Sequence, residues 1–291
     1  MTSKYTPEEK KKLVELLGEL TEPHISAFSD AFQRFGQWLQ NVNKQYVPLA
    51  ESFSKVNWKE VRERLDGMQE RSSKTMDIAA NQGWFFNWQD SLQNTLKLID
   101  DIESAEDSEI DEILEQYYDE NLDWFTSTLC SSYPARKRVI EAAVNAHKRN
   151  DDEGFILSIP VFLAQADGLF WEISGIPSPM SKVRGGGALT GSNWIKDKIG
   201  NNQRANNLLS PFFKLHDIDL LKSQSKRNKD SAEDGKIFNA LNRHQVLHGE
   251  VSNYGTKINS LKAFSLVIFI GLHLPDILKR ISSDQESPES L

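Results

Sequence analysis

The stretch DDEGFILSIPVFLAQADGLFWEI, residues 151–173, decides the fold class of this chain. Its apolar side chains recur mainly at steps of three and four residues, which is the period of a helix rather than a strand. They are Phe155, Ile156, Ile159, Phe162, Leu163, Ala166, Phe170 and Ile173. Asp151 or Asp152 is suited to cap the first turn. Because Pro160 lies inside the pattern, we expect a kink or an early break there.

Helical patterns continue on both sides of this stretch. Upstream, the apolar spacing and capping residues predict helices over 7–20, 25–42, 57–68, 90–101, 110–129 and 134–149. Downstream, they predict helices over 193–199, 206–215, 230–248 and 258–272. No segment alternates apolar and polar residues as a half-buried strand does. We therefore predict an all-α fold, a multi-helix bundle without a sheet.

An acidic run at 103–112 interrupts the apolar pattern and suggests a domain boundary. We expect an N-terminal helical region at 1–104, a helical domain at 105–281 and a disordered polar tail at 282–291. Within the first region, the aromatic loop at 83–88 is predicted to seal the ends of helices.

The composition indicates a globular protein of a reducing compartment. Cys130 is the one cysteine among 291 residues, so no intrachain disulfide can form. The longest apolar run, 263–274, is too short to cross a bilayer, and the N-terminus has no apolar signal core. We therefore expect a cytoplasmic protein with no membrane partner.

Charge is distributed unevenly along the chain. Residues 1–173 hold 18 Lys/Arg and 31 Asp/Glu, a balance of −13, whereas residues 174–262 hold 14 and 7, a balance of +7. The remainder holds 2 and 4, which recovers the net charge of −8. A solvated basic loop and a face for an anion such as a phosphate backbone both account for this asymmetry. The basic stretch at 222–229 is expected to be exposed and to face RNA.

The basic segment contains the densest group of ionisable side chains, NRHQVLHG at 242–249. His244 and His248 are four residues apart and share one face of a helix, which Gly249 is suited to end. A zinc protease needs a glutamate directly after the first histidine, and Gln245 cannot act as that base. A structural interpretation also stays open, because histidines interact favourably with a helix C-terminus.

Metal-independent RNA cleavage is the third interpretation. It needs a base for the ribose 2′-OH, an acid for the leaving 5′-oxygen and a cation for the phosphorane, and histidine and arginine suit these roles. Arg243 and His248 are about 140° apart around an ideal helix. A second copy of the chain facing the first brings two arginines and two histidines into one cleft.

The pattern Arg-polar-x-x-x-His, formed by Arg243, His244 and His248, resembles the signature of the HEPN superfamily. The segments Tyr254-Gly255-Thr256, Asn259-Ser260-Leu261-Lys262-Ala263 and Ala164-Gln165-Ala166-Asp167-Gly168 are also similar to this family, and the resemblance covers residues 105–281. It implies a dimeric, cofactor-free endoribonuclease of the kind found in toxin–antitoxin or phage-defence systems. By this resemblance His248 is the general acid/base, Arg243 the phosphate ligand and His244 the supporting polar group.

Further site residues and partners follow from this interpretation. Lys226, Arg227, Tyr254 and Lys257 are expected to bind RNA, and Gln165 and Asp167 to support the site. No metal ion is expected, and the expected partners are RNA, a second copy and an antitoxin or regulatory protein. The alternative function is a non-catalytic helical interaction or oligomerisation protein.

Overall fold

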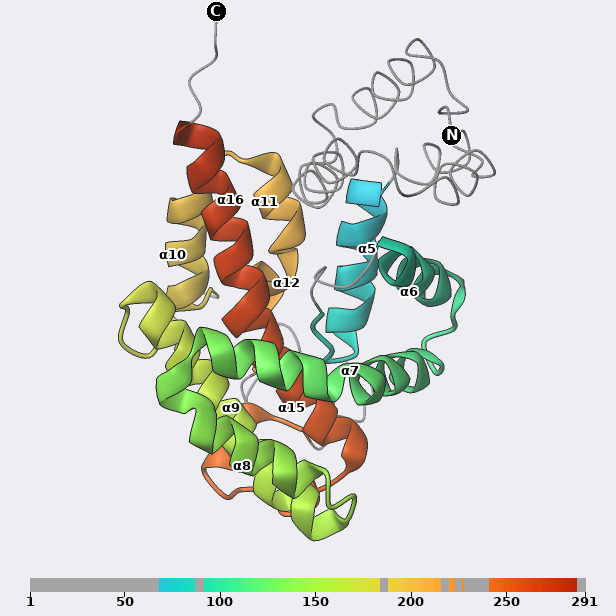
Figure 1. Ribbon diagram of the computed structural model, residues 1–291. Coiled ribbons are helices and arrows are strands. Elements are labelled where there is room, and N and C mark those ends of the chain that lie inside the picture. Colours follow the sequence, from blue (N-terminus) through green and yellow to red (C-terminus); the bar gives the residue numbers. More distant parts are fainter. Residues whose placement is uncertain are drawn as a thin grey trace, which may run out of the picture. The chain divides into compact units, whose positions relative to one another are not determined.

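The computed structural model describes residues 68–86, 92–183, 188–215, 220–222, 227 and 241–286 (Figure 1). The contacts divide the chain into two units, 1–71 and 72–291, and nearly all described residues belong to the second. The regular elements of the described residues are helices, with one isolated antiparallel bridge between Lys182 and Leu189, so the all-α prediction is confirmed. Apart from Met68, the helices expected before α5 lie outside the described residues.

The first half of the described chain forms long helices and one short turn of 3₁₀-helix. They are α5 (Met68–Asn81), α6 (Leu92–Ser104), α7 (Ile110–Ser132), the 3₁₀ turn Pro134–Arg136, α8 (Lys137–His147) and α9 (Asp152–Ser174). Four of these agree with the predicted helices at 90–101, 110–129, 134–149 and 151–173. The chain continues in helix through Pro160, so the early break expected there does not occur.

The second half contains shorter helices followed by one long rod. They are α10 (Thr190–Ile199), α11 (Gln203–Leu208), α12 (Ser210–Lys214), α14 (Arg243–Leu247), α15 (Lys257–Ile268), the π-helical turn η3 (Phe269–His273) and α16 (Leu274–Glu286). The single helix expected over 206–215 is therefore wrong, because Leu209 interrupts it and Pro211 opens α12. Helix α16 continues to Glu286, so the tail expected to be disordered from Ser282 is helical over its first residues.

Helix α15 forms the centre of the second unit. Every residue from Asn259 to Leu274 is buried, which agrees with a sequence that is apolar on all sides. The helix packs against α7 and α9, and α8 packs against the same two helices (Figure 1). Its continuation, α16, packs against α10 and α11. The core therefore extends along the rod formed by α15, η3 and α16, from its contacts with α7 to its contacts with α11.

The polar side chains of the central rod each have a partner, as buried polar groups require. Ser265 Oγ accepts a hydrogen bond from the backbone N–H of Phe85 (3.1 Å). Lys262 Nζ lies 2.8 Å from Asp111 Oδ1, and Asn259 Nδ2 donates to the carbonyl of Tyr254 (2.9 Å). These contacts fix the rotation of α15 against its neighbours.

The aromatic side chains of the loop that the structure describes, Trp84, Phe85 and Phe86, pack into the core of the second unit. Trp84, Phe85 and Phe86 are buried, and the indole of Trp84 stacks on Tyr118 with ring centroids 5.8 Å apart. Trp84 Nε1 also donates to Asp111 Oδ1 (2.7 Å). The loop thus joins α5 to the core of the second unit.

The contacts between residues divide the chain into its two units after Arg71, whereas the sequence suggested a domain boundary after residue 104.

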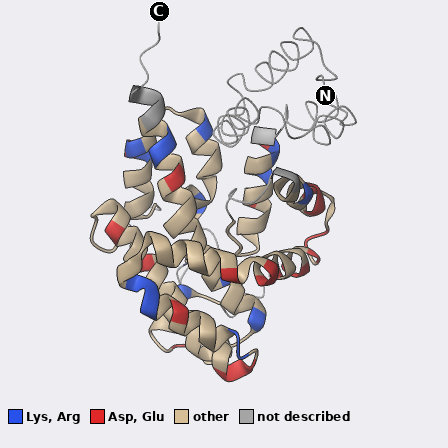
Figure 2. Cartoon of the chain, viewed as in Figure 1, with Lys and Arg blue, Asp and Glu red and all other residues tan. Residues whose placement is uncertain are grey.

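Acidic and basic side chains gather on different helices (Figure 2). Acidic side chains gather along α6 and α7, and basic ones on α10, α11 and α16 (Figure 2).

By length and composition alone, α9 and the rod from Lys257 to Ser282 are long and apolar enough to cross a membrane. Half of the α9 window and 83% of the rod window are buried inside the protein, as in core helices.

The close approach of α8 and α9 predicts a large effect for Gly154→Ala. A Cβ at Gly154 would lie 2.2 Å from the backbone carbonyl oxygen of Ala146. The helices must therefore separate, and we expect a loss of about 2 kcal/mol or more despite the higher helix propensity of alanine. Urea denaturation measures the shift in midpoint, with the exposed Ser127→Ala as the control. An unchanged midpoint contradicts this packing.

Candidate functional site

The segment from Leu241 to Gly249 is a short capped turn. Asn242 Oδ1 accepts from the backbone N–H of Gln245 (3.2 Å), and Gly249 follows the last turn with a φ of 70°. The sequence predicted one long helix over 230–248. Within the described residues this prediction is wrong, because the helix begins at Arg243. The buried side chains of Leu241 and Val246 hold the turn on the bundle. The expectation of a helix-ending glycine at Gly249 is confirmed.

Both histidines of the turn face outward and lie side by side. The imidazole centroids of His244 and His248 are 4.3 Å apart, and both residues are exposed. His244 Nε2 lies 3.5 Å from Glu250 Oε1. Within the described part of the chain, no group of three or more His, Cys, Asp or Glu side chains is placed to hold a metal ion. The turn therefore presents two accessible imidazoles next to a carboxylate.

Arg243 lies beside the histidines and is held by α9. Arg243 Nη2 donates to Asp167 Oδ2 at 2.6 Å, and both side chains are partly exposed. Arg243 Nε and Asp167 Oδ1 are buried and have no hydrogen-bond partner among the described residues. The carboxylate restrains the guanidinium through Nη2, and about a fifth of the Arg243 side chain (21%) stays exposed.

The remaining predicted site residues have different surroundings. Arg227 is buried and donates to Gln245 Oε1, which brings it next to α14. Lys222 is also buried, so the basic stretch at 222–229 is not uniformly exposed as expected. Gln165 accepts from Arg136 Nη1 (3.0 Å), which ties it to the start of α8 rather than to Arg243.

Two further predicted RNA ligands lie on the segment that leads into α15. Tyr254 is half-buried and packs against the core. The ammonium of Lys257 is bound by the carboxylates of Asp119 and Glu115, and the hydrogen bond to Asp119 is the main cause of its raised pKa. Lys226 lies outside the described residues.

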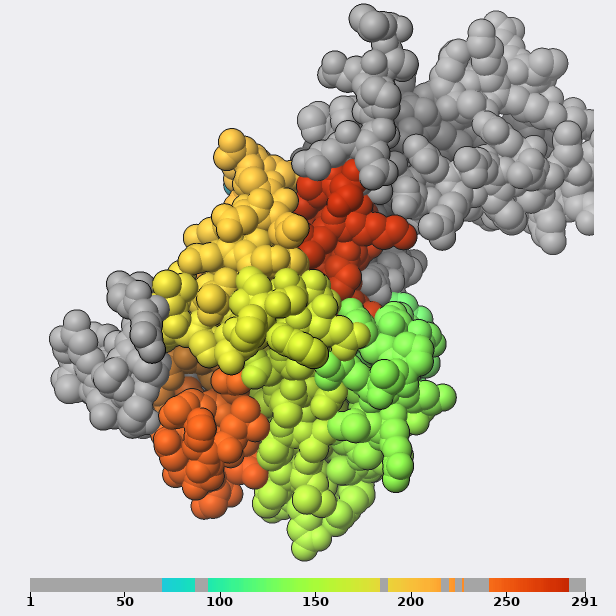
Figure 3. All heavy atoms as spheres, turned by 90° about the vertical axis from the view of Figure 1, so that its left-hand side faces the viewer, coloured from blue at the N-terminus to red at the C-terminus, as the bar shows by residue number. Residues whose placement is uncertain are grey.

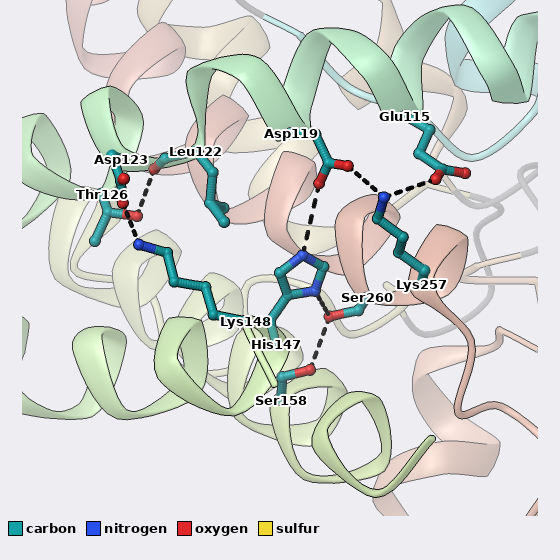
Figure 4. Close-up of polar contacts among 10 residues, drawn as sticks. All are labelled: Glu115, Asp119, Leu122, Asp123, Thr126, His147, Lys148, Ser158, Lys257 and Ser260. Carbon is teal, nitrogen blue, oxygen red and sulfur yellow. Dashed lines mark hydrogen bonds and ion pairs between the residues drawn. The ribbon is translucent and has the colours of Figure 1, made fainter. Parts of the chain in front are cut away.

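A second polar cluster, which the sequence did not suggest, lies inside the bundle (Figure 4). His147 Nδ1 and Ser260 Oγ are 2.8 Å apart, and Ser260 Oγ lies 2.7 Å from Ser158 Oγ. On the other side of the ring, His147 Nε2 is 4.0 Å from Asp119 Oδ1. The serine, histidine and carboxylate thus stand in the order of a nucleophilic triad.

The burial of this cluster decides its role. Ser158 and Ser260 have no exposed surface, so a substrate carbonyl cannot reach either hydroxyl. Burial lowers the pKa of His147, and the carboxylate of Asp119 offsets part of that effect. The cluster therefore links α7, α8, α9 and α15 as a buried hydrogen-bond network. In the sequence, the cluster is indicated by no more than one serine inside each of two apolar helices, Ser158 in α9 and Ser260 in α15.

Comparison of this chain with protein-family models, curated proteins and solved structures finds no match.

Proposed function

We propose that this protein is a metal-independent endoribonuclease whose active site is completed by a second copy of the chain. The observation that carries the proposal is the exposed turn of α14, where two imidazoles lie next to an arginine that is anchored by Asp167. Imidazole serves as acid and as base near neutral pH, and guanidinium binds phosphate with two parallel hydrogen bonds.

The roles of the three side chains follow from RNA chemistry. His248 transfers the proton, either from the 2′-hydroxyl or to the departing 5′-oxygen. Arg243 binds the phosphate and stabilises the charge that grows on its oxygens, with Asp167 keeping the guanidinium in place. His244 supports the proton transfer from the adjacent position. The cleavage leaves a 2′,3′-cyclic phosphate and a free 5′-hydroxyl.

The geometry of one turn supports the need for a second copy. The attacking and leaving oxygens of an in-line displacement lie on opposite sides of the phosphorus. Two imidazoles with centroids 4.3 Å apart lie on the same side of any phosphate that they contact together. We therefore place His248 of another copy on the side of the phosphate opposite to Arg243 and His244.

The test is cleavage of a long single-stranded RNA in the presence of EDTA. We expect the wild-type protein to produce fragments with cyclic phosphate ends, and His248→Ala prepared in the same way to leave the RNA intact. Because His248 is exposed, the variant should keep the wild-type melting temperature. If wild type leaves varied RNAs intact, the exposed turn belongs to a non-catalytic interaction protein. Equal cleavage by the variant identifies a contaminating nuclease.

A further inference from the structure

The two imidazoles of the α14 turn lie within reach of one common ion. The backbone N–H of His248 donates to the carbonyl of His244 (3.0 Å), so the two side chains leave the chain one turn apart on the same face. Their ring centroids are 4.3 Å apart, and the ring planes make an angle of 53°. The His244 side chain is 57% exposed and His248 is also exposed, so an ion reaches both rings from solvent. Figure 3 shows this segment, in orange, on the surface beside the yellow-green spheres of α9.

The backbone that carries the two histidines is fixed at both ends. Asn242 Oδ1 accepts from the backbone N–H of Gln245 at the start of the turn. At its end, Gly249 has a φ of 70°, and the backbone N–H of Glu250 donates to the carbonyl of Gln245 (2.8 Å). The buried side chain of Val246 lies between these points. Binding an ion therefore needs rotation of two exposed imidazoles about their last side-chain torsions, which are broad for histidine, and no ordering of the chain.

The separation of the rings fits two neighbouring ligands of one metal ion. An ion about 2.0 Å from a ring nitrogen lies about 3.1 Å from the ring centre, so two imidazoles at a right angle have centres about 4.4 Å apart. The tetrahedral angle that zinc prefers would need about 5.1 Å. The observed 4.3 Å agrees with the right angle, which is the preferred geometry of Cu²⁺ and Ni²⁺ with nitrogen ligands.

The charges around the two rings favour a cation. Glu250 Oε1 lies 3.5 Å from His244 Nε2, and its side chain is 45% exposed. The positive charge of Arg243 is balanced by Asp167, whose Oδ2 lies 2.6 Å from Arg243 Nη2. With neutral imidazoles, these three charged groups carry one positive and two negative charges. The carboxylate of Glu250 is therefore the uncompensated charge of the group, next to the ring that an ion would bind.

We propose that His244 and His248 bind one Cu²⁺ ion as a pair of adjacent ligands, with Glu250 beside them. Within the described residues no three His, Cys, Asp or Glu side chains are grouped to hold an ion, so water completes the coordination and the ion exchanges with solvent. Cu²⁺ is the tightest binder of such a site, ahead of Ni²⁺ and Zn²⁺. The bound ion occupies a lone pair on each imidazole. One consequence rests on the proposed function: the ion blocks proton transfer, so it inhibits cleavage and is not a cofactor.

The experiment is a titration of the untagged full chain with Cu²⁺ in the absence of RNA, followed by calorimetry and electron paramagnetic resonance. We expect one strongest site per chain, with the splitting pattern of two imidazole nitrogens at less than one equivalent of Cu²⁺. His244→Ala and His248→Ala should each weaken this site by at least about 10-fold and leave one nitrogen in the spectrum. Glu250→Gln should weaken it less. The matched control is Leu247→Ala, an exposed position of the same turn, which should bind as the wild type does.

The outcomes separate this inference from the proposed function. Unchanged Cu²⁺ affinity in both histidine variants overturns the inference and means an adventitious ion only, held by other groups such as His24 or His216, which lie outside the described residues. A wild-type spectrum with one imidazole nitrogen, or equal weakening in Leu247→Ala, also overturns it. A two-nitrogen site on a protein that leaves RNA intact in EDTA supports the metal site and contradicts the nuclease. Cleavage that continues at full Cu²⁺ occupancy supports the site and contradicts proton transfer by these histidines.

Discussion

We expect Arg243→Ala and His248→Ala each to cleave RNA on the order of 10²–10⁴-fold more slowly than the wild-type protein, and an equimolar mixture of the two to recover a measurable part of the proposed activity. The individual losses are expected because one variant lacks the phosphate ligand and the other lacks the proton-transferring group. Recovery is expected because the proposed site takes its arginine from one copy and its histidine from the other. Initial rates on a fluorescent RNA, with EDTA present, measure both effects.

The size of the recovery follows from counting subunits. Random exchange makes half of the dimers mixed, and each mixed dimer has one site with both side chains and one site with neither. The mixture should therefore reach about a quarter of the wild-type rate.

Arg243→Lys is the matched variant, since it keeps the positive charge and loses the two-pronged guanidinium. Its rate of RNA cleavage should stay well below that of the wild-type protein. A mixture no more active than its components shows that each site uses a single chain.

The long apolar helices were predictable because their periodicity is a local property. Residues 151–173 carry a helical period and an acidic cap, and the structure forms α9 there with Asp151 accepting from Gly154 N–H (2.6 Å). The run from 258 is apolar on all sides and becomes the buried rod. In both cases burial against neighbours reinforces the local preference, so sequence and structure agree.

The turn at 242–249 shows where a local pattern was misread. Apolar residues on both sides of Asn242 suggested one helix over 230–248. Asn242 is nevertheless a strong N-cap, and its side chain accepts from the N–H of Gln245, three residues later. The capping residue therefore carried more information about the start of α14 than the apolar spacing before it.

The contacts that build both polar clusters were beyond prediction because they are not local. Asp167 and Arg243 are 76 positions apart, and His147 and Ser260 are 113 apart. The sequence identified Asp167 as a polar residue on an apolar helix, without indicating its partner. Nothing in the sequence around His147 marked it as part of a polar cluster. Its role depends on α15 crossing that turn, which is a property of the packing.

His273 should make the protein lose stability in acid. Its side chain is buried in the π-helical turn, where Nε2 lies 3.0 Å from the carbonyl of Leu208 and the ring stacks on Phe269. Since a carbonyl only accepts, Nε2 carries the proton of the neutral ring. Burial lowers the pKa of His273 from 6.5 to about 4, because the imidazolium would lose its hydration, and the hydrogen bond to Leu208 opposes part of this shift.

The sign of the pH dependence follows from proton uptake. Between about pH 6.5 and about pH 4, the unfolded chain binds a proton at this histidine and the folded protein does not. Acid therefore favours unfolding over this interval, and the contribution of His273 to stability is fully present above pH 6.5. The shift corresponds to about 3 kcal/mol at the lower limit. His147, whose pKa is also lowered by burial, adds a loss in the same direction.

His273→Phe isolates this effect, because phenylalanine keeps the stacking on Phe269 and cannot titrate. At pH 7 the variant should be less stable than wild type by about 1–3 kcal/mol, since the carbonyl of Leu208 loses its donor. Toward pH 4 the wild type should lose about 3 kcal/mol more than the variant, so the two stabilities converge or cross. Carboxylates and His147 titrate alike in both proteins and cancel in the difference. Urea unfolding at closely spaced pH values measures the two profiles, and parallel profiles would show that His273 is hydrated or charged in the folded protein.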